Sequence, residues 1–122
     1  MRFSFAEGMT QASYYAPPLA QACEAAGYTS MTIADSLIYP QESDSKYPPY
    51  TDTGDREFLL GKEFIETFIL CAHLFAVTEK IRLTPFVLKL PIRPPVLVAK
   101  QASSLAFLSG NRLGLGVGLS PW

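Results

Sequence analysis

The chain has 122 residues, a formal net charge of −1 at pH 7, and 48% hydrophobic residues, which suits one ordinary domain with its own core. The mixed, nearly balanced charge gives no indication of a nucleic-acid or membrane partner, and no apolar run is long enough to span a bilayer. Because the first residues also lack the apolar stretch of a signal peptide, we expect a cytoplasmic protein.

Strand-like and helix-like segments alternate along the first part of the chain. Alternating hydrophobicity predicts a short strand at residues 2–5. A helix is expected to begin at the proline pair 17–18, which suits a first helical turn, and to end at Gly27. A second strand is predicted at residues 30–34 and leads directly to Asp35.

Residues 36–61 form the longest interruption in this alternation. They combine prolines, glycines, tyrosines and many charges, so we expect a long loop. Loops of this length in compact domains are usually functional or disordered. A second helix is then predicted at residues 63–78, a third strand at 81–87 and a proline-rich loop at 88–94.

The last third of the chain completes the pattern. The proline pair 94–95 opens a helix with apolar periodicity, a turn at 109–111 closes it, and a short glycine-alternating strand follows. The resulting β-α-β-α-β-α-β order predicts an α/β fold with a parallel sheet and right-handed crossovers. An open doubly wound sheet and a (β/α)8 TIM barrel are the two common forms. A barrel needs roughly 250 residues, so residues 1–122 would be its N-terminal half.

Three glycines share one face of the last predicted strand. Gly114, Gly116 and Gly118 do not form a dinucleotide-binding fingerprint, because their spacing is wrong and they lie within the strand. Their period of two places all three on one side. Two interpretations stay open: tight packing inside a barrel, or close approach of a flat cofactor.

Polar side chains follow the first two predicted strands and would meet at one edge of a parallel sheet. Glu7 and Asp35 could orient a cofactor ring or act as acid or base, but they could also cap a helix or form a loop ion pair. Ser36 shares the position of Asp35 and is a second catalytic candidate. Tyr39 could line the mouth of a substrate site, on the same side as Glu7, or pack within its own loop.

Other reactive residue types point to structural roles. Cys23 and Cys71 lie in helical, apolar contexts and are expected to be buried thiols. They and His73 do not have the spacing of a metal site, and His73 is expected to pack in a helix or lie on its surface. Lys89 and Arg93 could meet an anionic ligand, although solvated side chains are the simpler expectation.

Three stretches carry a recognisable family pattern. They are Ala-Asp-Ser-Leu at 34–37, Thr-Glu-Lys-Ile-Arg-Leu-Thr at 78–84 and, most specifically, residues 91–118. In the last stretch the pattern has a basic residue, a proline, an alanine–lysine pair, Leu-Ser-Gly-Gly-Arg and Gly-Val-Gly. Over its whole length the chain resembles the bacterial luciferase-like monooxygenase superfamily, and most closely its coenzyme F420-dependent oxidoreductase branch.

The resemblance implies a (β/α)8 TIM barrel that binds FMN or coenzyme F420 at the C-terminal rim. It implies four parallel strands in order 1-2-3-4, with all helices on one face. Asp35 would help to position the cofactor ring, a non-proline cis peptide near Phe86-Val87 would lie against one ring face, and Gly118 would lie at the same rim. Many members have Asp-His after strand two, whereas this chain has Asp35-Ser36, so the histidine acid or base is absent.

The implied activity is that of an oxidoreductase transferring hydride between coenzyme F420, or alternatively FMN, and an unknown small organic substrate. An FMN-dependent monooxygenase is the alternative within this class, and a non-catalytic, flavin-binding half-barrel that self-associates is the alternative from another class. We expect a homo-oligomer and no metal. We also expect the isolated chain to be inactive and to self-associate, because the inward faces that carry Phe3 or Ile33 would lack an opposing half.

Overall fold

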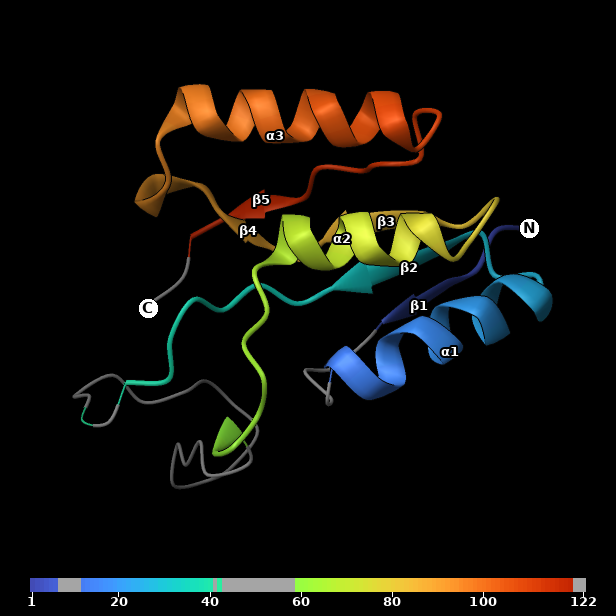
Figure 1. Ribbon diagram of the computed structural model, residues 1–122, viewed down its shortest axis with the longest axis horizontal. Helices are drawn as coiled ribbons and strands as arrows, with labels where there is room; N and C mark the ends of the chain where they lie inside the picture. Colours follow the sequence, from blue (N-terminus) through green and yellow to red (C-terminus); the bar gives the residue numbers. More distant parts are fainter. Residues whose placement is uncertain (7–11, 41, 43–58, 120–122) are drawn as a thin grey trace.

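The computed structural model describes residues 1–6, 12–40, 42 and 59–119. In chain order its elements are β1 (Ser4–Ala6), α1 (Ala12–Ala25), β2 (Ser30–Ile33), α2 (Thr67–Ala76), β3 (Arg82–Pro85), β4 (Leu88–Lys89), the 3-10 helix η2 (Leu90–Ile92), α3 (Pro95–Leu108) and β5 (Val117–Gly118). Figure 1 shows α2 lying between α1 and α3. No helix in this described part of the chain is long and apolar enough to cross a membrane.

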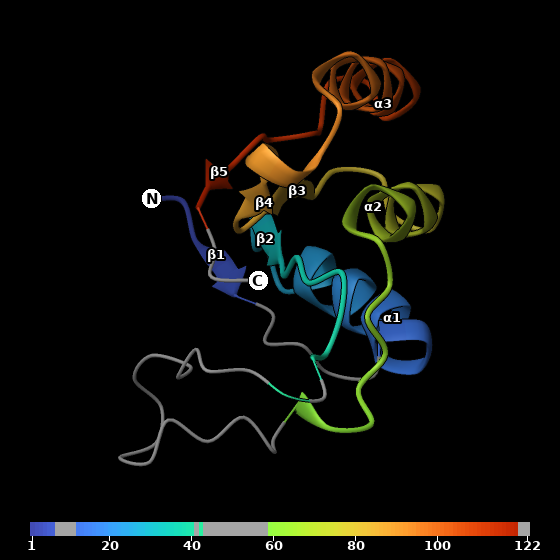
Figure 2. The ribbon, with the colours of Figure 1, turned by 90° about the vertical axis from the view of Figure 1, so that its left-hand side faces the viewer.

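The strands are parallel and follow chain order. β1 pairs with β2 and β2 with β3, while β4 pairs with β5 and an isolated bridge joins Leu83 to Leu113. Figure 2, which looks at the carboxyl ends of the strands, shows them as a curved row with α1, α2 and α3 all on one side. Since a doubly wound sheet has helices on both sides, this arrangement is that of a partial barrel.

The expected continuous four-stranded sheet is interrupted at Pro85, between the third and fourth strands. On the amino-terminal side of Pro85, the Leu83 N–H donates to the Arg112 carbonyl (3.2 Å), and the Gly114 N–H donates to the Leu83 carbonyl (2.8 Å). The next rung of this ladder would need an N–H at residue 85, which proline lacks. The two strands therefore separate into two short ladders.

Pairing resumes beyond the interruption. The Leu88 N–H donates to the Gly116 carbonyl (2.7 Å), and β4 then runs beside β5. The predicted third strand at 81–87 is therefore too long, because β3 ends at Pro85. The predicted loop at 88–94 is also wrong in part, since it contains β4 and η2.

The first helix begins earlier than expected. Pro17 and Pro18 lie inside α1 rather than in its first turn. The helix extends ahead of them because its buried stripe does: Ala16, Ala20 and Cys23 recur at helical spacing and are all in the core. Packing against the sheet thus outweighs the loss of backbone donors at the two prolines. The helix stops before Gly27, as predicted, where φ is +85°.

The second helix begins later than the predicted residue 63. Glu66 is its N-cap, and its Oε2 accepts hydrogen bonds from the backbone N–H groups of Phe68 (2.9 Å) and Ile69 (3.0 Å). Satisfying these two otherwise unpaired donors defines the helix start. The third helix has the predicted bounds, and Asn111 in the turn after it has a φ of +64°.

The core lies between the helices and the sheet, and the opposite face of the sheet is polar. On β2, Met31 and Ile33 are buried toward the helices, whereas Ser30 and Thr32 are only half-buried on the other face. The expectation that Ile33 points into the open half of the barrel is therefore wrong. The open face and its amino-terminal edge form a hollow of about 770 Å³, with lining residues that include Arg2, Ser4, Glu24, Ser30, Arg82 and Thr84.

Candidate functional site

Asp35 lies just beyond the carboxyl end of β2 and is held by Arg93, which follows η2. Arg93 Nη2 lies 2.8 Å from Asp35 Oδ1, and Arg93 Nη1 lies 2.8 Å from Asp35 Oδ2. The Asp35 side chain is 0% exposed and that of Arg93 is 9% exposed. Burial alone would lower the pKa of Arg93, but hydrogen bonds and charge from Asp35 and Glu66 raise it above its ordinary value. The pair is a buried, bidentate ion pair.

Glu66 extends this ion pair to the start of α2. Its Oε1 lies 3.4 Å from Arg93 Nη2, while its Oε2 caps the helix as described above. One carboxylate thus joins the helix terminus to the guanidinium that holds Asp35. The carboxyl end of β2, the segment before α3 and the start of α2 are therefore fixed together at one rim.

Lys89 joins the same cluster from β4. Its backbone N–H donates to Asp35 Oδ2 (2.9 Å), and its Nζ donates to Ser36 Oγ (3.2 Å). The residue is only 6% exposed. Burial lowers the pKa of its ammonium group, the charge of Asp35 raises it and that of Arg93 lowers it, with a net decrease. Ser36 itself is half-buried and so stays accessible at the rim.

The expected cis peptide is present between Phe86 and Val87. The Phe86 N–H donates to the Ile33 carbonyl (2.8 Å), which fixes this peptide beside the end of β2. Phe86 is 68% exposed. Because Lys89 pairs with Gly118 in the β4–β5 ladder, Asp35, the cis peptide and Gly118 all lie at the carboxyl rim, as predicted.

The three alternating glycines pack against the neighbouring strand. A Cβ on Gly114 would collide with the Thr84 side chain, and one on Gly116 with the Pro85 carbonyl oxygen. A Cβ on Gly118 would lie 2.6 Å from Val87 Cγ2. These approaches account for all three glycines by tight packing, which was the first of the two interpretations. Contact between Gly118 and a cofactor stays a prediction.

Glu7 and Tyr39 are the remaining two candidates. Glu7 lies outside the described residues. Tyr39 stacks on Phe64, with ring centroids 6.4 Å apart and planes 26° apart, so it packs against the segment that leads into α2. Its role beside a substrate stays a prediction, as do the catalytic roles of Asp35 and Ser36.

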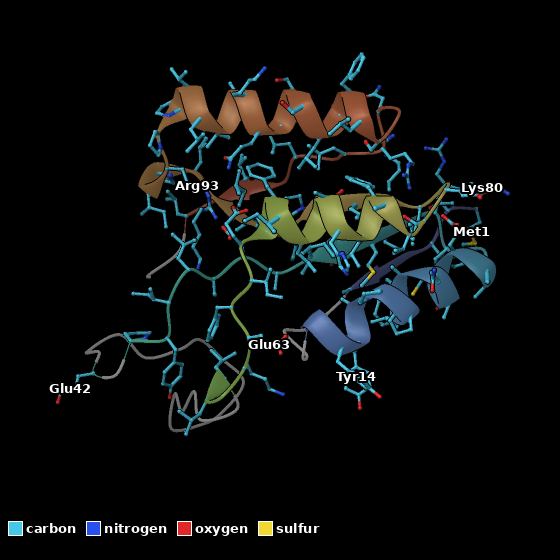
Figure 3. The ribbon with its side chains drawn as sticks, viewed as in Figure 1. Met1, Tyr14, Glu42, Glu63, Lys80 and Arg93 are labelled. Carbon is cyan, nitrogen blue, oxygen red and sulfur yellow. The ribbon has the colours of Figure 1, made fainter. Side chains whose placement is uncertain are left out.

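Sequence reasoning missed the importance of Lys89 and Arg93. Both were expected to be solvated, and this is wrong: Lys89 is buried, and the Arg93 side chain is only 9% exposed beside Asp35. Figure 3 labels Arg93 at the end of the molecule opposite Lys80. The available signal was a pair of basic residues four positions apart in a proline-rich, apolar segment, directly after a strand end.

Arg112, which follows the turn after α3, makes its contacts at the amino-terminal end of the strands. Arg112 donates to the Thr78 hydroxyl (3.0 Å) and to the Phe75 carbonyl (3.0 Å), and its guanidinium lies 4.8 Å from the centroid of the Phe75 ring. Its Nε also donates to the Ser109 carbonyl (2.8 Å). This arginine therefore joins α2, α3 and the start of β3, far from the Asp35 cluster.

Residues 3–121 match the luciferase-like monooxygenase family. The chain belongs to this family. Two uncharacterised proteins, one from Mycobacterium bovis and one from Mycobacterium tuberculosis, are each 69% identical to the chain over 122 residues. The match covers 100% of the chain and 42% of each relative, so the chain spans less than half the length of these relatives.

A solved structure has the same fold. It is the oxygenating constituent of 3,6-diketocamphane monooxygenase from Pseudomonas putida, a type II Baeyer–Villiger monooxygenase in complex with FMN. It is 16% identical to the chain, with a TM-score of 0.71, and the match covers 100% of the chain and 30% of that protein. The chain thus forms part of a TIM-type barrel.

Proposed function

We propose that this chain is the N-terminal part of a luciferase-like oxidoreductase that transfers hydride between coenzyme F420 and a small organic substrate. FMN is the alternative cofactor. The observation that carries the proposal is the convergence of Asp35, Ser36, Lys89 and the Phe86–Val87 peptide at the carboxyl ends of parallel strands. In barrels of this type the active site lies at this rim.

The residues present fit the ring portion of such a cofactor. Phe86 and the peptide after it form an exposed surface beside the end of β2, and Gly118 adds no side chain next to it. Asp35 and Arg93 are occupied with each other, so their role is to hold this surface in place. When bound, the flavin or deazaflavin supplies the hydride acceptor and donor.

An FMN-dependent monooxygenase is a second candidate within the family. The observation that favours it is the FMN complex of the Pseudomonas monooxygenase with the same fold. A non-catalytic half-barrel that binds flavin is a further candidate. We also propose a cytoplasmic homo-oligomer as the working form.

Cofactor titration of the complete polypeptide tests the proposal. We expect absorbance and fluorescence titrations to show saturable binding of coenzyme F420, with weaker binding of FMN. Tighter binding of FMN would transfer the proposal to the monooxygenase alternative. Absence of binding by either cofactor would contradict both. The isolated 122-residue chain, measured in parallel, is expected to bind poorly, since phosphate sites in such barrels usually follow strands seven and eight.

A further inference from the structure

We propose that Arg82 binds a carboxylate carried by the strands that close the barrel, and that this ion pair crosses the barrel interior at the amino-terminal end of the strands. The inference rests on one part of the proposed function, namely that this chain is one portion of a barrel. It concerns the end of the strands opposite to the Asp35 cluster, and it does not depend on which cofactor is bound.

Three polar residues form one row across the open face of the sheet. Ser4 of β1 pairs with Ser30 of β2, and Ser30 pairs with Arg82 of β3, so the three residues lie at the same level. The two serine hydroxyls are hydrogen-bonded to each other. Within β3, Leu83 and Pro85 are buried, whereas Arg82 is exposed on the open face. The three residues of the row all line the hollow of about 770 Å³ described above.

The guanidinium of Arg82 is held in place without being neutralised. Its Nη1 donates to the Asn111 carbonyl (3.0 Å), and its Nη2 donates to the Leu113 carbonyl (3.3 Å). These contacts use two of the five N–H groups of the side chain, and a carbonyl oxygen carries no net charge. The ion pairs within the described part of the chain are made by Arg93 and do not include Arg82. The remaining N–H groups and the positive charge of Arg82 can therefore serve a further partner.

Closure of the barrel requires such a partner. The chain forms part of a TIM-type barrel, and the interior of such a barrel is a packed core rather than a pore. When further strands cover the open face, Arg82 loses the water that now surrounds it. A charge removed from water is tolerated when an opposite charge and hydrogen bonds replace that water. A carboxylate supplies both, because its two oxygens match the planar guanidinium.

The charges around the hollow indicate what kind of surface covers it. The carboxylate of Glu24 lines the hollow, but it already accepts hydrogen bonds from the backbone N–H groups of residues 79–81. Arg2 and Lys80 add two more cations to Arg82. A second copy of this chain on the open face would bring like charges together, which is unfavourable. The occupant that fits is a different wall with an inward-facing Asp or Glu.

The pH dependence of stability in the complete polypeptide tests the inference. Arg82→Met and Arg82→Lys are compared with the unmodified protein by urea unfolding in a buffer without phosphate. A carboxylate paired with arginine has a folded pKa below its unfolded value of about 4, so the pair stabilises the fold above that value and the effect is lost as the pH falls. We expect Arg82→Met to raise the unfolding equilibrium constant about a hundredfold at pH 7. This difference should shrink steadily below about pH 5, and Arg82→Lys should give a smaller increase with the same pH dependence.

Lys80→Met is the matched control, since Lys80 is an exposed cation that lines the same hollow. It should change the unfolding equilibrium constant less than about threefold. If Arg82→Met fails to fold, Arg82→Lys decides the question in the same pH series.

An effect of Arg82→Met that is as small as that of Lys80→Met, or that is the same at every pH, would overturn the inference. An effect that appears only after inorganic phosphate is added would show that a dissolved anion, and not a side chain of the barrel, binds Arg82, and would also overturn it. Because the Asp35 cluster lies at the other end of the strands, cofactor titration of the unmodified polypeptide tests the proposed oxidoreductase separately. Failure of that titration would leave the stability comparison valid.

Discussion

Arg93 and Asp35 face each other through two hydrogen bonds of equal length, 2.8 Å each, across 58 positions of the sequence. The contact ties the segment after β2 to the segment before α3. Because both side chains are removed from water, each depends on the other for its charge to be tolerated there. The pair therefore controls the shape of the rim as well as its charge.

Replacing Asp35 by Asn should destabilise the protein strongly. Breaking a buried ion pair typically costs about 3 kcal/mol or more, and of its ion pairs Arg93 would keep only the longer one, with Glu66 (3.4 Å). Urea unfolding of the complete polypeptide measures the change. Glu79→Gln, at an exposed position, is the matched control and should change stability by less than about 0.5 kcal/mol. Equal stability of the two variants would contradict a structural role for Asp35.

Glu24 should make stability depend on pH in the acidic range. Partial burial raises its pKa, but hydrogen bonds from the backbone N–H groups of Ile81, Lys80 and Glu79 and the charge of Arg112 lower it, with a net decrease from 4.5. A carboxyl whose folded pKa lies below its unfolded pKa stabilises the fold above the unfolded pKa. That stability is lost as the pH falls through the folded pKa.

The Glu24→Gln variant isolates this contribution. We expect the difference in unfolding free energy between the unmodified protein and Glu24→Gln to be constant above about pH 5.5, where the unfolded carboxyl is ionised. The difference should shrink steadily as the pH is lowered past 4.5. A difference that does not change with pH would show that the carboxylate charge contributes nothing to these hydrogen bonds.

Alanine at the alternating glycines should cost different amounts at two positions. A Cβ at Gly116 meets the backbone carbonyl of Pro85, which cannot move aside, so we expect overpacking to cost about 3 kcal/mol. A Cβ at Gly118 meets only the Val87 side chain, so about 1 kcal/mol is expected. Adding Val87→Ala should relieve the strain of Gly118→Ala and leave that of Gly116→Ala unchanged. Thermal unfolding of the four variants checks this order.

The two cysteines should be unreactive in the folded protein. Burial, together with the charge of Glu66, raises the pKa of Cys71 to about 12 from 9.0, and burial also raises the pKa of Cys23. Iodoacetamide at pH 8 should label neither thiol until guanidinium is added, as mass spectrometry would record. Because the folded pKa of Cys71 is above the unfolded one, its contribution to stability is full below pH 9 and is lost as the pH rises toward 12. Rapid labelling of native Cys71 would contradict its burial.

The fold was largely predictable because each element has a local cause. The β-α alternation, the stop at Gly27 and the proline pair before α3 all act through nearby backbone geometry. The predicted bounds were wrong where contacts between residues distant in sequence determine where an element begins or ends. The start of α1 depends on packing of Ala16 against the sheet, and the end of β3 depends on a rung that Pro85 cannot supply to another strand.

The site was less predictable for the same reason. Sequence position alone placed Asp35, Ser36 and Gly118 at one rim, because parallel strands end on the same side. It could not show that Arg93 would occupy both oxygens of Asp35, or that Lys89 would reach Ser36, since these contacts span more than 50 positions. Only the folded structure shows that Lys89 and Arg93 both contact the Asp35 carboxylate.

At Pro85 the predicted third strand divides into β3 and β4, which pair with different neighbours. On its amino-terminal side, β3 is bonded to β2 and bridged to the next strand through Leu83, and that part maintains the barrel wall. On its carboxyl-terminal side, the short β4 segment carries Lys89 and is tied chiefly to Asp35 and β5. Because this rung is missing, the β4–β5 ladder that carries Lys89 is held separately from the β2–β3 ladder that sets the register of the barrel wall.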